Sequence, residues 1–150
     1  MAVIDIARKN VETGTPDELA TDVVRRLHKQ EVGALVIVDD DGEPLGLVGH
    51  RQLSQALLSD EFDPDETPVS EFIDDDLVTV AGDAGLYDLL DLLSDTGRRR
   101  VPVVEDGELA GIISISDVVI LLGMELQHVA NTIRSTSPAY EREGPMFFDR

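Results

Sequence analysis

The sequence predicts an α/β (α+β) fold in which two β-α-β-β-α repeats pack together as a pseudo-two-fold pair. Three observations predict it: the chain is duplicated internally, strand and helix patterns alternate within each copy, and 42% of the 150 residues are apolar. A copy of roughly 50 residues would bury too little surface to be stable alone. We therefore expect the two copies to share one packed unit.

The duplication is visible when the chain is shifted against itself by 66 residues. After a turn that is one residue longer in the first copy, the shift becomes 65 residues. The superimposed segments are Val3–Ile6 with Val69–Phe72, Val36–Asp39 with Pro102–Glu105, and Gly46–Val48 with Gly111–Ile113. This divides the chain into repeat 1 (residues 1–60), a polar, proline-bearing linker (61–68), repeat 2 with an extended last helix (69–134) and a tail (135–150).

Repeat 1 carries the signals of a helix, a hairpin and a second helix. Pro16 suits the first turn of a helix, and an apolar helical face follows at Leu19, Val23, Val24 and Leu27. The wholly apolar run Leu35–Val38 is typical of a buried strand, and the turn signal Asp41-Gly42 leads into a second strand. The remaining expected elements are the strand Pro44–Gly49 and the helix Arg51–Leu58.

Repeat 2 shows the same signals in the same order. Its expected elements are a strand at Leu77–Val80, a helix with Leu86, Leu89, Leu90 and Leu93 on one face, strands Val101–Val104 and Leu109–Ser114 joined across Asp106-Gly107, and a last helix from near Ser116 towards Arg134.

The second hairpin and the start of the last helix resemble a known family. The segments that carry the resemblance are Pro102–Val104, the turn Asp106-Gly107 and the stretch Gly111–Asp117. That stretch follows the pattern glycine, two apolar residues, Ser or Thr, two residues, Asp. Together with the duplication, these segments resemble a tandem pair of cystathionine-β-synthase (CBS) domains, often called a Bateman module, over most of the chain.

The resemblance implies clefts between the repeats for an adenosine-containing ligand such as AMP, ADP, ATP or S-adenosylmethionine. It assigns the ribose hydroxyls to Asp117, with Ser114 and Ser116 beside ribose or phosphate and Ile112 lining the pocket. A carboxylate only accepts hydrogen bonds, so one group can hold two adjacent hydroxyls, and a helix N-terminus favours phosphate. The other interpretation is an ordinary helix start, with Ser116 as the cap and Asp117 in the first turn.

By the same resemblance, the facing wall comes from repeat 1 at Val32, Gly33 and Ala34, whose small side chains leave room for an adenine ring. Repeat 1 departs from the family pattern at its own junction, where Gly49 replaces Ser or Thr and Gln52 replaces Asp. We therefore expect one competent cleft and one degenerate cleft.

Three consecutive arginines, Arg98–Arg100, precede the second hairpin. In the AMP-activated kinase γ subunit, which the module resembles, basic residues at the positions of Arg99 and Arg100 reach ligand phosphates. Guanidinium groups suit phosphate geometry. The alternative is a solvated charge block that pairs with the abundant acids or protects a strand edge.

The charge balance excludes some classes of partner. Thirty-one acidic residues against twelve basic ones give a net charge of −19, so we expect neither nucleic acid nor an anionic membrane as a partner. The only lysines are Lys9 and Lys29, a balance that resembles cytosolic proteins of salt-accumulating halophiles such as haloarchaea. The alternative is an acidic protein of an ordinary cell with a basic partner.

The sequence offers no pattern for catalysis or for a metal site. It has no cysteine, and the triplets Asp39–Asp41 and Asp74–Asp76 lack the spacing of a calcium loop. His28, His50 and His128 lack the spacing of zinc ligands. No apolar run reaches the ~18 residues of a membrane span, and the N-terminus lacks the core of a signal peptide. We therefore expect a cytoplasmic protein that is not an enzyme.

The function that these observations favour is a regulatory module that binds an adenine nucleotide or adenosyl ligand and needs no cofactor. We expect a homodimer that acts on an unidentified regulated protein. The residues available for the dimer surface, unless they only fill the core, are Leu53, Leu57, Leu58, Val118, Val119, Leu121 and Leu122. The tail is expected either to dock on a partner or to be disordered. The competing hypothesis is a structural interaction module with empty clefts.

Overall fold

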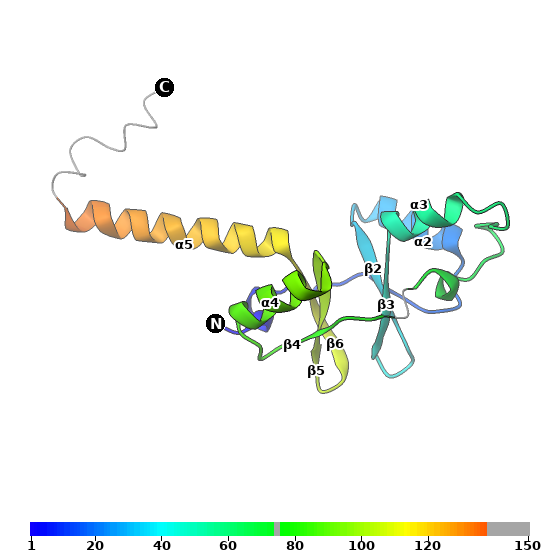
Figure 1. Cartoon of the computed structure of the whole chain (residues 1–150), viewed down its shortest axis with the longest axis horizontal. Coiled ribbons are helices and arrows are strands. Elements are labelled where there is room, and N and C mark those ends of the chain that lie inside the picture. Colours follow the sequence, from blue (N-terminus) through cyan, green and yellow to red (C-terminus); the bar gives the residue numbers. More distant parts are fainter. Residues whose placement is uncertain (74–75, 138–150) are drawn as a thin grey trace, which may run out of the picture. The chain divides into compact units, whose positions relative to one another are not determined.

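The computed structural model of the chain describes residues 1–73 and 76–137 (Figure 1). The chain forms one compact unit at Met1–Ser114 and a second unit that begins at Ile115. The first unit contains two three-stranded sheets, in the strand orders β1-β2-β3 and β4-β5-β6. In each sheet the first strand is parallel to the second, and the second and third form an antiparallel hairpin.

The elements of the two repeats follow each other in the same order. Repeat 1 consists of α1 (Val3–Ile6), β1 (Thr13–Gly14), α2 (Ala20–Lys29), β2 (Ala34–Val38), β3 (Pro44–Gly49) and α3 (His50–Leu57). Repeat 2 consists of the 3-10 helix η1 (Val69–Phe72), β4 (Val80–Ala81), α4 (Leu86–Thr96), β5 (Arg100–Glu105), β6 (Glu108–Ser114) and α5 (Ile115–Thr136). The mixed α/β class and the tandem repeat are therefore confirmed.

Strand register reproduces the sequence shift residue by residue. Ala34 pairs with Gly49 in repeat 1, and Arg100 pairs with Ser114 in repeat 2. Both hairpins also carry an irregularity at the same place, between Ile37 and Val38 and between the corresponding Val103 and Val104. The duplication therefore extends to the backbone, and a position in one repeat identifies its counterpart in the other.

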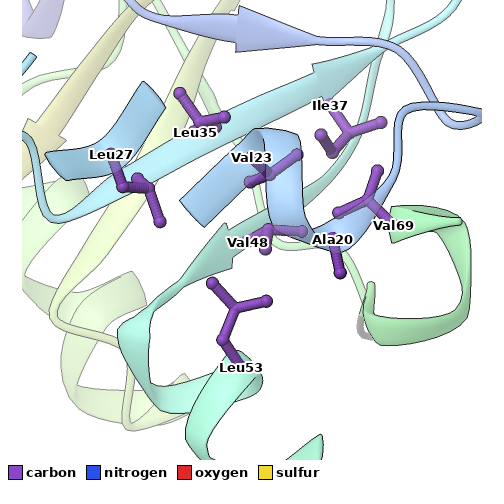
Figure 2. Packing of buried hydrophobic residues seen from close by; sticks show 8 residues of the cluster. All are labelled: Ala20, Val23, Leu27, Leu35, Ile37, Val48, Leu53 and Val69. Atoms are coloured by element: carbon purple, nitrogen blue, oxygen red, sulfur yellow. The ribbon is translucent and has the colours of Figure 1, made fainter. Parts of the chain in front are cut away.

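The core of repeat 1 lies between α2 and the β2–β3 hairpin. Ala20, Val23 and Leu27 are one face of α2 and are buried, because they recur at the three- and four-residue spacing of a helix. Figure 2 shows them beside side chains from the strands, from α3 and from η1. The strand, α3 and η1 members of this cluster are Leu35, Ile37, Val48, Leu53 and Val69.

The first segment of each repeat binds to the other repeat. The backbone N–H groups of Val3 and Ile4 donate to the carbonyls of Ala84 and Gly82, at 2.8 and 3.0 Å. Shifted by 66 residues, the N–H groups of Val69 and Ser70 donate to the carbonyls of Glu18 and Pro16, at 2.7 and 3.0 Å. This reciprocal exchange ties the two sheets into one unit, because neither repeat holds its own first segment.

Two glycines allow the exchanged segments to cross the sheets closely. A Cβ on Gly46 would lie 1.7 Å from Cγ2 of Ile73, and a Cβ on Gly111 would lie 3.0 Å from the carbonyl oxygen of Arg8. Arg8 and Ile112 also exchange both backbone hydrogen bonds, at 2.9 and 3.0 Å. Glycine at position 46 is therefore a packing requirement of the crossing, and a side chain at position 111 would make a tight contact with the Arg8 backbone.

The structure corrects three details of the sequence prediction. Helix α2 begins at Ala20 and not at Pro16, because Thr15–Glu18 forms a turn in which the Thr15 N–H donates to the Glu18 carboxylate at 2.6 Å. Val24 is 42% exposed and does not belong to the buried face. The strand predicted at Leu77–Val80 is limited to Val80–Ala81, since only these two residues pair with β5.

Candidate ligand cleft at the strand–helix junctions

A cleft lies between the β3–α3 junction of repeat 1 and two segments of repeat 2, the residues before β4 and the connection from α4 to β5. Its main part has a volume of about 610 Å³ and is lined by Arg51, Gln52, Gln55, Asp76, Thr96, Gly97 and Arg98. A small extension of about 20 Å³ is lined by Gly46, Leu47, Asp76, Leu77, Val78, Arg98 and Arg100. Asp76 and Arg98 border both parts, so we treat them together as the repeat 1 cleft.

The β3–α3 junction holds Gln52 at the edge of this cleft. The backbone N–H of Gly49 donates to Oε1 of Gln52 at 3.0 Å, which closes the start of α3. A Cβ on Gly49 would lie 2.7 Å from the carbonyl oxygen of Gly33, so the junction is packed against the neighbouring strand. The departures from the family pattern therefore serve local packing and helix capping.

The arginine triplet is divided among three environments. Arg98 is half-buried, and its Nη2 donates to the carbonyl of Asp76 at 3.2 Å. Arg100 begins β5 and borders the small extension of the cleft. Arg99 is exposed and borders neither part of the cleft. The structure thus brings Arg98 and Arg100 to the repeat 1 cleft.

The predicted adenine wall at residues 32–34 is occupied at its centre. A Cβ on Gly33 would lie 2.8 Å from Nη1 of Arg100, so the guanidinium fills the space above this glycine. Val32 and Gly33 also border a separate hollow of about 620 Å³ beside α2, together with His28 and His50. Ala34 is half-buried at the start of β2. Space beside Gly33 for an adenine ring would require the Arg100 side chain to move.

The residues predicted to hold ribose lie at the second strand–helix junction. Ile112 and Ser114 belong to β6 and are half-buried, whereas Ser116 and Asp117 belong to the first turn of α5. Ser116 is exposed and is the second residue of α5, so the interpretation of Ser116 as the helix cap is wrong. By the register of the repeats, Asp117 is the counterpart of Gln52.

The other predicted features have local structural roles or lie outside the description. In the first acidic triplet, Oδ1 of Asp39 accepts from the N–H groups of Asp41 and Glu43, both at 2.9 Å, which stabilises the hairpin turn. Asp74, Asp75 and residues 138–150 lie outside the described residues. Within the described residues, no three His, Cys, Asp or Glu side chains gather as metal ligands, and no helix is long and apolar enough to cross a membrane.

Sequence reasoning missed part of the cleft. Arg51 stands directly before Gln52 in the junction motif, and its place there is the signal that would have identified it. Asp76–Val78, which precede β4, are counterparts of residues 10–12, which the 66-residue shift would have indicated. Gln55 lies one helical turn beyond Arg51 and borders the same cleft.

Comparison with known proteins places the two repeats in one family. Residues 3–59 and 69–123 each match the CBS domain. An uncharacterized protein of Methanopyrus kandleri is 32% identical over 119 residues, which is 79% of this chain and 61% of that protein's length. The crystal structure of a CBS-domain containing protein from Agrobacterium tumefaciens superimposes with a TM-score of 0.71 at 32% identity, covering 81% of this chain and 98% of the other.

Two further crystal structures share the fold and contain bound ligands. CBSX2 in complex with AMP has a TM-score of 0.72 at 24% identity, covering 84% of this chain and 98% of CBSX2. A CBS domain pair in complex with 5′-methylthioadenosine and S-adenosyl-L-methionine has a TM-score of 0.73 at 23% identity, covering 83% and 98%. With both repeats matched to the same domain and folded in the same order, this chain belongs to the CBS-domain family as a tandem pair.

Proposed function

We propose that this CBS pair is a non-catalytic regulatory module that binds an adenosine-containing ligand, with the ribose held at the junction of repeat 2. One observation carries the proposal. The β3–α3 junction of repeat 1 borders a cleft of about 610 Å³, and the register of the repeats makes Ser114–Asp117 the counterpart of that junction. The repeat 2 junction carries the hydroxyls and the carboxylate that repeat 1 lacks.

The chemistry of Asp117 suits a ribose. An ionised carboxylate only accepts hydrogen bonds and has room for two donors, which matches the two adjacent hydroxyls of a ribose. Hydrogen bonds to a charged group are also stronger than those between neutral groups. The complexes of CBSX2 with AMP and of the other CBS pair with 5′-methylthioadenosine and S-adenosyl-L-methionine support the same ligand class.

The proposal includes a homodimer formed through α5. This 22-residue helix exposes large apolar side chains along its whole length, which a helix in contact only with water would not carry. The exposed residues are Val119, Ile120, Leu122, Met124, Leu126, Val129 and Ile133. A second copy of the chain would cover them and would leave the module free to act on a regulated protein.

The proposal also places the module in the cytoplasm of a cell with high internal salt. The support is the net charge of −19, with only two lysines among the twelve basic residues. Concentrated salt screens the repulsion between the acids, which would otherwise destabilise the compact state.

The ligand class is tested by finding what the chain retains and what it binds. Native mass spectrometry of the full chain, purified in ammonium acetate, should show the added mass of an adenosine-containing compound. Calorimetric titration with AMP, ADP, ATP, S-adenosylmethionine and 5′-methylthioadenosine in 2 M KCl should give saturable heat for at least one of them, with GTP as the control. Absence of binding by all five would favour the structural interaction module instead.

A further inference from the structure

The lining of the repeat 1 cleft is cationic in a chain that is strongly acidic. Arg51, Arg98 and Arg100 border the cleft, and Asp76 is the only acidic residue in its described lining. The whole chain carries thirty-one acids against twelve bases, so three arginines against one acid in the described lining depart from the composition of the chain. A local positive field in such a protein favours an anion.

The counterparts in repeat 2 lack this charge. The register of the repeats matches Arg51 with Ser116, Arg98 with Val32, and Arg100 with Ala34. Gln52 differs in the same direction, because its counterpart is the acid Asp117, whereas Asp76 differs in the opposite direction, because its counterpart is the neutral Asn10. The equivalent positions have therefore diverged. The positions around the repeat 1 cleft carry three arginines and no acid at the place of Asp117, and their counterparts carry Asp117 and no arginine.

Ion pairs distinguish two of the cleft arginines from an arginine that stabilises the fold. Within residues 1–73 and 76–137, neither Arg51 nor Arg100 forms an ion pair, whereas Arg26 lies 2.7 Å from the Glu18 carboxylate and 3.4 Å from that of Glu12. Arg51 also stands in the first turn of α3, where the helix dipole disfavours a cation. A bound anion would offset the unfavourable interaction of Arg51 with the helix dipole.

We propose that the repeat 1 cleft is a phosphate-selecting site, in which Arg51 determines specificity and the ligand is recognised by its phosphoryl groups and not by its ribose. Guanidinium groups bind phosphate oxygens in pairs of parallel hydrogen bonds. Gln52 is neutral and its Oε1 already accepts from Gly49, so it is poorly suited to capture two hydroxyls. This goes beyond the proposed function, which assigns the ribose to repeat 2.

The test uses inorganic tripolyphosphate as a probe that has phosphoryl groups and no ribose. Calorimetry of the full chain is performed at the lowest KCl concentration at which far-UV circular dichroism shows the folded protein. Tripolyphosphate should bind, its affinity should fall as KCl rises, and Arg51→Gln should weaken it by about tenfold or more. Arg51→Lys should weaken it less, since the charge remains.

Matched variants separate this site from general charge effects and from the ribose site. Arg25→Gln removes an exposed arginine paired with Asp22 on α2 and should leave tripolyphosphate binding unchanged. Asp117→Asn should also leave it unchanged, so failure here is distinguishable from failure of the ribose assignment. The affinity of ATP at the Arg51-dependent site is then compared with that of tripolyphosphate. Tighter binding of ATP identifies a nucleotide as the ligand, and equal affinity identifies a free polyphosphate. Both results support a phosphate site that depends on Arg51.

Three results would overturn the proposal: no binding of tripolyphosphate, parent-like binding by Arg51→Gln, or an equal loss in Arg25→Gln. If Arg51→Gln does not fold, Arg100→Gln is judged by the same criteria, because Arg100 borders the same cleft from the opposite repeat.

Discussion

Single residues at equivalent positions distinguish the two strand–helix junctions. Gln52 and Asp117 occupy the same place in the two repeats, and Gln52 accepts the hydrogen bond that closes the start of α3. Asp88 does the same at the start of α4, where its Oδ2 accepts from the Gly85 N–H at 3.1 Å. A capping role is therefore available to an acid at this helix position, and ligand binding by Asp117 must be separated from it.

Asp117→Asn makes that separation. Asn keeps the shape and one acceptor oxygen but loses the charge, so affinity for the adenosine ligand should fall by about 1.5–3 kcal/mol, the worth of hydrogen bonds to a charged group. Stability without ligand should change by less than ~1 kcal/mol, since mainly the dipole interaction is lost. Calorimetry and urea unfolding at fixed KCl measure the two quantities.

Asp88→Asn is the matched control, because it makes the same chemical change at the equivalent position of a different helix. It should leave ligand affinity unchanged. Ser114→Ala should show a smaller loss of affinity than Asp117→Asn, since a neutral hydroxyl contributes less. Parent-like binding by both Asp117→Asn and Ser114→Ala would show that the ribose assignment is wrong.

Gly46 tests the crossing of the exchanged segment. In Gly46→Ala the new Cβ would lie 1.7 Å from Cγ2 of Ile73, so the crossing must shift and stability should fall by about 1–3 kcal/mol. Combining it with Ile73→Ala should cost less than the sum of the two single changes, which a double-mutant cycle of urea unfolding measures. The control is Gly123→Ala, where the new Cβ would have no atom within 4 Å apart from its chain neighbours and the backbone of its own helix, and where helix propensity should rise. Strict additivity would mean that the crossing does not depend on this glycine.

At the scale of elements, α5 is notable for the large apolar side chains that it exposes to water. Leu126 is 69% exposed at the middle of the helix, among other exposed apolar residues. If a second copy covers this helix, Leu126→Glu should convert the dimer to a monomer, because a charge would be buried without a partner. Light scattering after size-exclusion chromatography in 2 M KCl measures the mass.

The control for α5 is Tyr87→Glu, which places the same charge at an 80% exposed aromatic residue on α4. It should leave the mass unchanged. A parent chain that is already monomeric at micromolar concentration, or a Leu126→Glu variant that remains dimeric, would rule out α5 as the dimer surface.

The elements that sequence patterns predicted well are those whose signals are local. The apolar run before Asp41-Gly42 and the turn itself lie within one hairpin, and β2 and β3 formed there as expected. The predicted start of α2 was wrong because the segment before it forms a turn at Thr15–Glu18 and is also held from outside repeat 1. Glu18 and Pro16 accept from the N–H groups of Val69 and Ser70, and Leu19 bridges to Pro68. The exchange of α1 and η1 is non-local in the same way.

The same difference between local and non-local signals applies to the candidate site. The strand–helix junction at Ser114–Asp117 followed from a motif within a few residues, and the structure places it where predicted. The contact of Arg100 with Gly33 joins positions 67 residues apart, and no pattern in either segment alone predicts it. The small side chains at Val32, Gly33 and Ala34 predicted open space for an adenine ring. In the structure, the long side chain of Arg100 from the other repeat fills the space beside Gly33.

At the scale of the whole molecule, the net charge of −19 should control stability. The melting temperature should rise steeply between roughly 0.1 and 2 M KCl, first by screening and then by exclusion of salt from the surface. Circular dichroism during heating measures it, and sucrose at matched osmolality without added salt is the control for exclusion alone. A flat curve over this range would remove the argument for a halophilic protein.

The measurement that tests the central claim most directly is a calorimetric titration of the full chain with adenosine in 2 M KCl. Adenosine carries the ribose and no phosphate, and the salt suppresses purely electrostatic binding. The account predicts about one site per chain, lost in Asp117→Asn and retained in Asp88→Asn, because only repeat 2 has the acid. Two equal sites per chain, or one site unaffected by Asp117→Asn, would contradict it.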